Sequence, residues 1–472
     1  MLARSTIRRC IRAPAASART TTHRRQLAAL AERFSPLFVA RKGEQVPVAS
    51  HARKTISKTS HGVVIATYDD LGPASTLAVV LGGGSRHDDA HHPGLAHIVK
   101  ASLIRNLPND NIVRTIRETE LRGDTLSTEL TRENIIIKSE FLRDDLVDAA
   151  PLLINSVFNQ HFYPYEFLDA IPRVVAESRA SLADPTISVL EALHRVAFRT
   201  GLGNPLFASE ESLHGLTRAH IAKFVSTHFK PERTAIVGVG ICHADLVEMV
   251  QGLLSKVKFG DASASESTST SKYHGGEVQT DGGPHAEAHV AVAFPGVPFT
   301  SPDYPASLVL RALLDSTPRI SYSHASEGAL ASASTPLTSL AGLHASYSDA
   351  GLIGFYAKGN ISEMKSVVQG AMQALGSVAS NVSDAALARA KKMAVIDGQA
   401  AVETKGDQAY EVGKQVLSSI GAFHSAADLA DAISKVTAQD VSKLASNALT
   451  AKPSMSSYGN TLLLPYLDDL KL

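Results

Sequence analysis

The chain has 472 residues, of which 46 are basic and 46 acidic, so its formal net charge at neutral pH is zero. Because the charges balance, the protein has no net positive electrostatic field that would attract nucleic acid. No nucleic-acid-binding motif is present either, so we expect no nucleic-acid partner. No uninterrupted apolar run reaches the roughly 18 residues of a membrane-spanning helix, which excludes a direct membrane span. The length allows about two to four domains.

The N-terminal segment has a composition of its own. Residues 1–31 contain seven arginines and no acidic residue, and the first acid is Glu32. Ile7 and Ile11 lie on one face of a potential helix. An Arg-rich, Ser/Thr/Ala-rich and acid-free N-terminus is typical of a mitochondrial transit peptide, which we place with its lead-in at residues 1–45. The alternative is a disordered basic arm.

The first strands and a glycine run follow. Residues 62–68 and 76–81 predict two strands separated by a turn, and Gly82–Gly84 come directly after the second strand. No Gly-Lys-Ser/Thr follows, so the glycines indicate close backbone approach rather than a phosphate loop. His87, His91 and His92 are predicted to lie in a solvated loop, because Pro93-Gly94 separates them from the next helix.

Helices and strands alternate through the rest of the first half. A helix begins near Leu95, and another at residues 111–122 ends at Gly123, a good C-terminal cap. Strands at 125–130 and 135–141 predict a hairpin, and Asp144 is expected to cap the next helix. Further helices are predicted at 165–182, 186–199, 217–229 and 245–254, with a strand at 234–240. This order predicts an α+β fold, a mixed or antiparallel sheet with helices on one side.

Residues 258–285 predict a Ser/Gly-rich linker near the middle of the chain. The segments around it repeat: residues 216–224 match residues 436–444 in pattern, and a strand at 351–357 precedes Asn360 as residues 135–141 precede Asp144. We therefore predict two homologous domains, residues 46–257 and 286–472. The equivalent helix of the second half, residues 305–314, contains neither His nor Glu and is predicted only to pack.

The helix after Pro93-Gly94 has one feature of a zinc peptidase. In an inverted zincin, His-x-x-Glu-His places two imidazoles on one helical face, with a glutamate that activates the metal-bound water. Here residues 97–101 read His-Ile-Val-Lys-Ala. Lys100 would repel a divalent metal and cannot act as the base, and Ala101 cannot ligate it. We expect no catalytic residue, bound metal or cofactor, and His97 alone predicts a buried core histidine.

With these elements placed, residues 46–465 resemble the pitrilysin and mitochondrial processing peptidase family, and within it the core protein 2 branch of ubiquinol:cytochrome c reductase. The motifs that carry the resemblance are residues 94–100, 131–134 with 141–145, 193–199, 228–229 and 237–240.

The resemblance assigns the family's zinc-site positions to individual residues. His97 takes the first ligand position, Lys100 the base position and Ala101 the second ligand position. Glu177 takes the third ligand position, and Ala170 replaces an acidic residue seven positions before it. Because the base and the second imidazole are missing, the resemblance implies a degenerate site without zinc. Glu177 is then expected to be a solvated helix residue.

The resemblance implies a non-catalytic structural subunit of the mitochondrial respiratory complex, peripheral to the inner membrane on its matrix side. Its expected partners are a core protein 1 homologue and the cytochrome b, cytochrome c and Rieske subunits of a dimeric complex. The alternative is the non-catalytic subunit of a mitochondrial processing peptidase, which uses a glycine-rich loop to handle presequences. The corresponding residues 315–328 contain only one glycine, which argues against that alternative.

Overall fold

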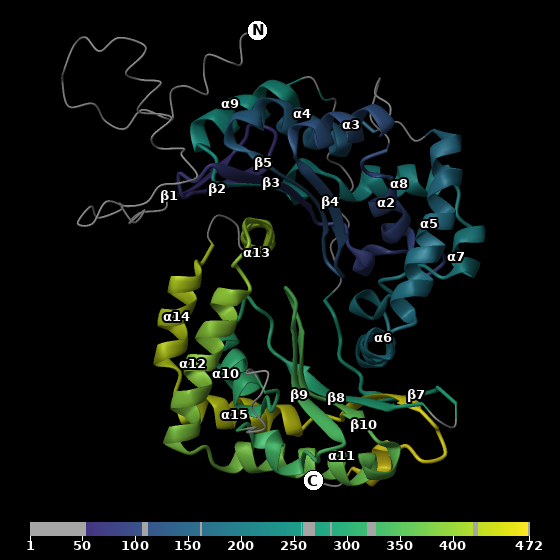
Figure 1. Ribbon diagram of the computed structural model, residues 1–472, viewed down its shortest axis with the longest axis vertical. Helices are drawn as coiled ribbons and strands as arrows, with labels where there is room; N and C mark the ends of the chain where they lie inside the picture. Colours follow the sequence, from purple (N-terminus) through teal and green to yellow (C-terminus); the bar gives the residue numbers. More distant parts are fainter. Residues whose placement is uncertain are drawn as a thin grey trace, which may run out of the picture.

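The computed structural model describes residues 53–105, 112–160, 163–255, 257, 270–283, 286–318, 327–418 and 423–470. The predicted transit segment at 1–45 lies outside the described residues. The α+β prediction is confirmed, since the described chain forms two sheets with helices packed against each (Figure 1).

The first sheet has six strands in the order β1-β2-β6-β3-β5-β4. Their bounds are β1 Arg53–Lys58, β2 Val64–Asp69, β3 Ala74–Leu81, β4 Thr125–Leu130, β5 Ile135–Leu142 and β6 Thr234–Val239. Strands β2 and β6 pair in parallel, and the other neighbours are antiparallel. The predicted hairpin is the β4–β5 pair.

The second sheet repeats this arrangement with five strands in the order β7-β11-β8-β10-β9. Its strands are β7 Gly276–Asp281, β8 Ala288–Gly296, β9 Thr338–Ser346, β10 Gly351–Gly359 and β11 Ser454–Gly459. Strands β7 and β11 are parallel, as β2 and β6 are, and the remaining pairs are antiparallel. The matching order and direction support the repeat seen in the sequence.

The remaining helices of the first half lie on one side of the first sheet, some against its face and others beside its β4 edge (Figure 1). They are α2 Leu95–Ser102, α3 Ile112–Arg122, α4 Leu146–Phe158, α5 Pro164–Leu182, α7 Glu210–His214, α8 Arg218–His228 and α9 His243–Leu254. The core between them and the sheet contains side chains with almost no solvent exposure, among them Leu77, Ile98, Ile137, Leu153 and Ile236. Burial of these side chains is the main term that holds the layer to the sheet.

Helices of the second half form an equivalent layer. They are α10 Tyr304–Leu314, α11 Ile361–Ser380, α12 Asp384–Ala400, α14 Ala426–Lys435 and α15 Ala438–Leu449. Asn360 caps α11 by accepting a hydrogen bond from the Ser362 amide. Thr217 and Thr437 are the N-cap residues of α8 and α15, in agreement with the repeat predicted around them.

One helix from each half crosses to the other sheet. Helix α6, Pro185–Phe198, belongs to the first half but packs on strands β7, β8 and β11 of the second sheet. Helix α13, Lys405–Ser418, belongs to the second half but packs on strands β2, β3 and β6 of the first sheet. Each sheet is therefore covered on both faces, and the expectation of helices on one side only was incomplete.

Two local predictions were wrong. Asp144 does not cap a helix, because residues Arg143–Asp145 form a 3-10 turn and α4 begins one residue later, at Leu146. The range 258–285 is not all linker, since residues 276–281 form β7. Its alternation of Glu277, Gln279 and Asp281 with smaller residues carries little apolar signal, so only pairing with β11 fixes it as a strand.

Candidate functional site

Helix α2 starts at a glycine that no other residue could replace easily. Gly94 has a φ of 87°, and a Cβ atom there would lie 2.4 Å from the Ala208 Cβ. The Asp88 carboxylate accepts hydrogen bonds from the Gly94 and Ala96 amides, each at 2.8 Å, and so satisfies the free N–H groups of the helix start. Burial raises the pKa of Asp88 to about 7 against the lowering effect of these bonds.

His97 is buried on α2, with 1% of its surface exposed. Its Nδ1 accepts a hydrogen bond from the Ala208 amide at 3.2 Å, so the neutral ring carries its proton on Nε2. That Nε2 lies 3.3 Å from Glu177 Oε2. Burial is the largest effect on His97 and lowers its pKa, although Glu177 opposes the shift. The prediction of a buried core histidine is therefore supported.

Glu177, on the neighbouring helix α5, is exposed to solvent as we expected, but it also forms an ion pair that its local sequence does not reveal. Its Oε1 lies 2.5 Å from Lys100 Nζ, and its side chain is 44% exposed whereas that of Lys100 is 12% exposed. Burial raises the pKa of Glu177, but the hydrogen bond and charge of Lys100 outweigh it and leave the pKa below its usual range. The packing of α2 against α5, which the local sequence does not reveal, brings the two side chains together.

Ala101 and Ala170 complete the set of positions named from the resemblance. Ala101 is partly buried and packs against the core of the first half, and Ala170 is buried on α5. The structure thus brings His97, Lys100 and Glu177 into one cluster, with methyl groups at the remaining two positions.

The chemistry open to this cluster is limited. An ammonium group has no lone pair to take a proton from water, and it places a positive charge beside the carboxylate that a divalent metal would need. Within the described ranges, no group of three or more His, Cys, Asp or Glu side chains is arranged to hold a metal ion. The cluster is an ion pair next to a neutral imidazole, a pattern suited to joining two helices.

A second histidine cluster was missed by the sequence analysis. His87 lies in a 3-10 turn rather than a solvated loop, and its Nε2 is 2.8 Å from a guanidinium nitrogen of Arg233. Arg233 also contacts His228 Nδ1 at 3.2 Å. Burial and the charge of Arg233 lower the pKa of His87 to about 3 and that of His228 to about 4. Two neutral imidazoles therefore accept hydrogen bonds from one arginine, a structural arrangement.

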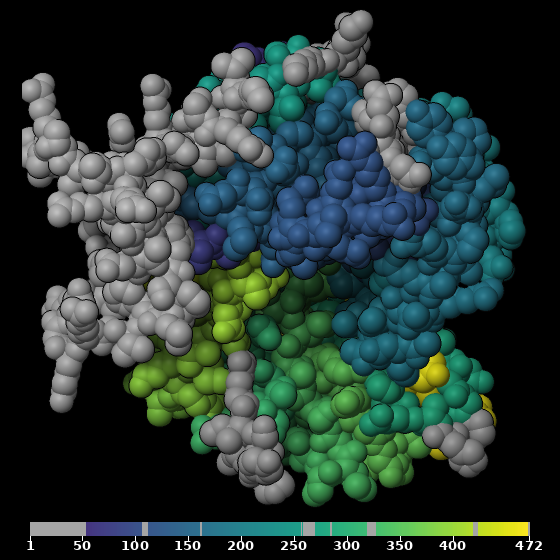
Figure 2. Space-filling view, turned by 45° about the horizontal axis from the view of Figure 1, so that its top comes forward, coloured from purple at the N-terminus to yellow at the C-terminus, as the bar shows by residue number. Residues whose placement is uncertain are grey.

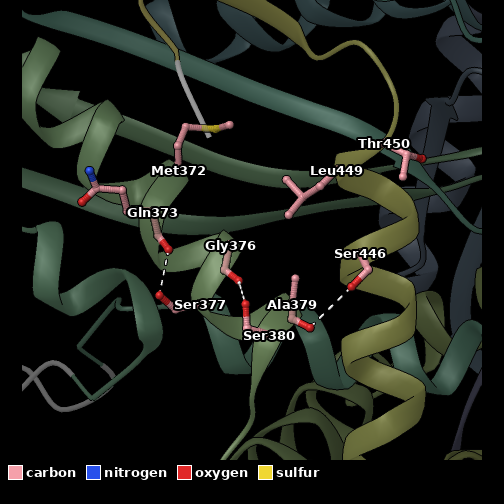
Figure 3. Close-up of a pocket in the computed structure, with 9 residues that line it drawn as sticks. All are labelled: Met372, Gln373, Gly376, Ser377, Ala379, Ser380, Ser446, Leu449 and Thr450. Carbon is pink, nitrogen blue, oxygen red and sulfur yellow. Dashed lines mark hydrogen bonds between the residues drawn. The ribbon is translucent and has the colours of Figure 1, made fainter.

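The second half has an open groove of about 560 Å³ between α11 and α15 (Figure 3). Its serine hydroxyls donate to main-chain carbonyls: Ser377 to Gln373, Ser380 to Gly376 and Ser446 to Ala379. None of the residues that line it is ionisable, so the groove itself supplies no acid or base.

Comparison with known families matches most of the chain to peptidase models. Residues 63–210 match the model described as Insulinase (Peptidase family M16), and residues 215–394 match the Peptidase M16 inactive domain. No helix within the described ranges is long and apolar enough to cross a membrane.

Individual relatives cover nearly the whole chain. Cytochrome b-c1 complex subunit 2 of Neurospora crassa is 30% identical over 92% of this chain and 94% of its own length. The subunit of the same name from Yarrowia lipolytica is also 30% identical, over 90% of this chain and 98% of its own. Mitochondrial-processing peptidase subunit alpha-2 of Dictyostelium discoideum is 27% identical over 85% of this chain and 90% of its own.

A solved structure shares the fold. A chain of the complex described as Complex III2 from Candida albicans, Inz-5 bound, aligns with a TM-score of 0.77 and 20% sequence identity. The alignment covers 89% of this chain and all of that one, so the two chains share their overall fold.

Proposed function

This chain belongs to the family of cytochrome b-c1 complex subunit 2, and from this premise we propose that it is a structural core subunit of a mitochondrial cytochrome b-c1 complex. It is a non-catalytic homologue of the M16 peptidases. Its contribution to the complex is assembly and stability, while other subunits carry the redox chemistry.

The single structural observation that carries the non-catalytic part of this proposal is the pair formed by Lys100 and Glu177, while the relatives carry the assignment to the complex. The position at which a peptidase needs a general base holds a cation, and that cation is bound to the carboxylate that would otherwise ligate the metal. Ala101 leaves no second imidazole, and His97 points its protonated nitrogen at Glu177. To bind zinc through Nε2, His97 would have to give up the proton on that nitrogen, and Glu177 would have to leave Lys100. Both side chains are therefore poor zinc ligands.

We place the subunit on the matrix side of the inner membrane, held there by protein partners. The relatives named as mitochondrial subunits support the compartment. The partners that we propose are a core protein 1 homologue and the cytochrome b, cytochrome c and Rieske subunits, in a dimeric complex. The alternative is a non-catalytic processing peptidase subunit, for which the 27% identical Dictyostelium discoideum relative is the supporting observation.

Native electrophoresis of gently solubilised mitochondrial membranes distinguishes the two. We expect this protein to migrate with the haem-bearing cytochromes in one large species. Migration as a soluble heterodimer with a zinc peptidase subunit would instead establish the alternative and overturn the structural proposal.

A second experiment tests the lack of catalysis. Lys100→Ala and Glu177→Gln should leave quinol oxidation by the assembled complex near the wild-type rate, because neither side chain takes part in the reaction. A large loss of activity in complexes that still assemble would contradict the proposal.

A further inference from the structure

The inner face of the first sheet is closed by a helix from the other half of the chain. Helix α13 approaches so closely that a Cβ atom at Gly413 would lie 2.5 Å from Val80 Cγ2. The contact is apolar and buried, and it consists of Ala409, Val412 and Val416 from α13 with Ala66, Ala78, Ala235, Val237 and Val239 from the sheet. Figure 2 shows second-half atoms, coloured yellow-green, directly against the first half.

The inner face of the second sheet is closed by α6 in the same way. The buried contact consists of Val189, Leu193, Ala197 and Phe198 of the first half, with Leu202 beside them, against Ala291, Ala293 and Leu352 of the second half. Polar contacts add to it, since Tyr347 Oη lies 2.8 Å from His194 Nε2 and Tyr356 Oη donates to Thr186 Oγ1 at 3.1 Å.

The turns of the two equivalent hairpins also bind one another. The Arg86 side chain is 5% exposed and donates to Asp349, in the β9–β10 turn, and to Glu133, in the β4–β5 turn. Glu133 in turn accepts hydrogen bonds from the Ser348 amide at 3.0 Å and the Ser348 hydroxyl at 2.5 Å. The Ser271 amide donates to Asp349 at 2.7 Å. We call Arg86, Glu133, Ser348 and Asp349 the hairpin latch.

We propose that the two halves are a single cooperative unit, in which neither sheet keeps its structure when the other unfolds. Residues 46–257 and 286–472 are then repeats in sequence but not separate folding domains. The physical reason is that opening either half removes the helix that covers the inner face of the other sheet. The exposed face is lined by alanine and valine in the first sheet and by alanine and leucine in the second, and it would meet water together with the charges of the latch.

Native-state hydrogen exchange on the full chain tests the proposal with one core variant in each half. Leu153→Ala empties a buried site on α4, and Leu375→Ala empties one on α11. In a cooperative unit each variant accelerates exchange by the same factor, roughly 30-fold or more, in β3 and β6 of the first sheet and in β8 and β10 of the second. Faster exchange confined to the half that carries the substitution overturns the proposal.

Milder variants cover the case in which the alanine variants do not fold. Ile154→Val in the first half and Ile433→Val in the second each remove one methylene from a fully buried side chain. Each of these variants should accelerate hydrogen exchange by roughly threefold, and by the same factor in both sheets. Leu121→Ala, at a side chain that is 87% exposed, is the control and should change neither sheet.

The latch offers a variant that touches neither core. Asp349→Ala removes the ion pair between Arg86 and Asp349 without leaving the buried arginine unpaired, because Arg86 keeps Glu133. The hydrogen bonds from Ser348 to Glu133 remain as the other part of the latch. We expect exchange in both sheets to accelerate together, several-fold. Faster exchange in only one of the two sheets would contradict the proposal.

Discussion

Helices α2 and α10 occupy equivalent positions in the two halves: α2 packs on β4 and β5, and α10 packs on β9 and β10. Each is also joined to the long helix beside it by a basic residue and an acid. Lys100 of α2 pairs with Glu177 of α5 at 2.5 Å, and Arg311 of α10 approaches Asp397 of α12 at 3.6 Å.

This comparison explains what the degenerate zinc position does. The second half shows that a cation and a carboxylate at these places can serve simply to join two helices, since α10 carries no imidazole. In the first half, Lys100 converts a metal-like position into the same type of link. His97 is the remaining difference between the halves, and its backbone partner Ala208 gives it a structural role.

The largest expected effect concerns the start of α2, which has no counterpart in α10. Gly94→Val should lower the free energy of unfolding by roughly 3 kcal/mol or more, because φ is positive and the Ala208 Cβ already occupies the space. Urea unfolding measures this. Gly123→Val is the matched control: its φ is also positive, but no atom lies within 4 Å of the added Cβ, so a smaller loss of about 1–2 kcal/mol is expected. Equal losses in the two variants would refute the steric explanation.

Acid should destabilise both halves through their buried histidines. Burial, as the largest cause, lowers the pKa of His87 and His194 to about 3 and that of His228 and His344 to about 4. A lowered folded-state pKa means that the unfolded chain binds more protons, so stability is lost as pH falls below about 6.5 toward these values. Asp88 acts in the opposite direction, because its raised pKa favours the folded state at low pH.

The histidines outnumber Asp88, so the net change between pH 7 and pH 5 should be a loss, roughly 1–2 kcal/mol for each histidine. Urea unfolding at the two pH values measures it. His344→Gln, in the second half, should reduce the difference between them. A difference as large in the variant as in the wild type would show that His344 does not contribute.

Restoring the metal motif on α2 should increase the difference between α2 and its equivalent α10. Lys100→Glu with Ala101→His places a second carboxylate beside Glu177, and we expect the free energy of unfolding to fall by about 1 kcal/mol in a chelator and to recover with zinc. Metal analysis after exhaustive dialysis should find zinc retained by the double variant but not by the wild type. Zinc retention by the wild type would contradict the non-metal assignment, and proteolysis need not return in the variant.

The smallest effects are expected from the helix-joining pairs themselves. Glu177→Gln and Asp397→Asn should each change the free energy of unfolding by less than about 1 kcal/mol, because Glu177 and Arg311 are both more than a third exposed. Thermal unfolding of the two variants side by side measures this. A loss of several kcal/mol from Glu177→Gln alone would mean that the first pair has a role that the second lacks.

Much of the fold was predictable from local pattern. The strand at 135–141, the helix that ends at Gly123 and the Asn360 cap each follow from apolar alternation or from a residue with one dominant conformational use. Strand β7 was missed because its residues carry no such pattern. Asp144 was misassigned because a 3-10 turn satisfies the same signal as a cap.

By itself, the sequence determined that the zinc motif is degenerate, since Lys100 and Ala101 lack the required chemistry wherever they lie. It also determined that the chain contains two homologous halves, since the pattern of residues 216–224 recurs at residues 436–444. Only the tertiary structure decided that Lys100 binds Glu177. It also decided that α6, from the first half, covers the second sheet and that α13, from the second half, covers the first. Those contacts join residues far apart in sequence, and they depend on how packed helices are oriented, which no local pattern encodes.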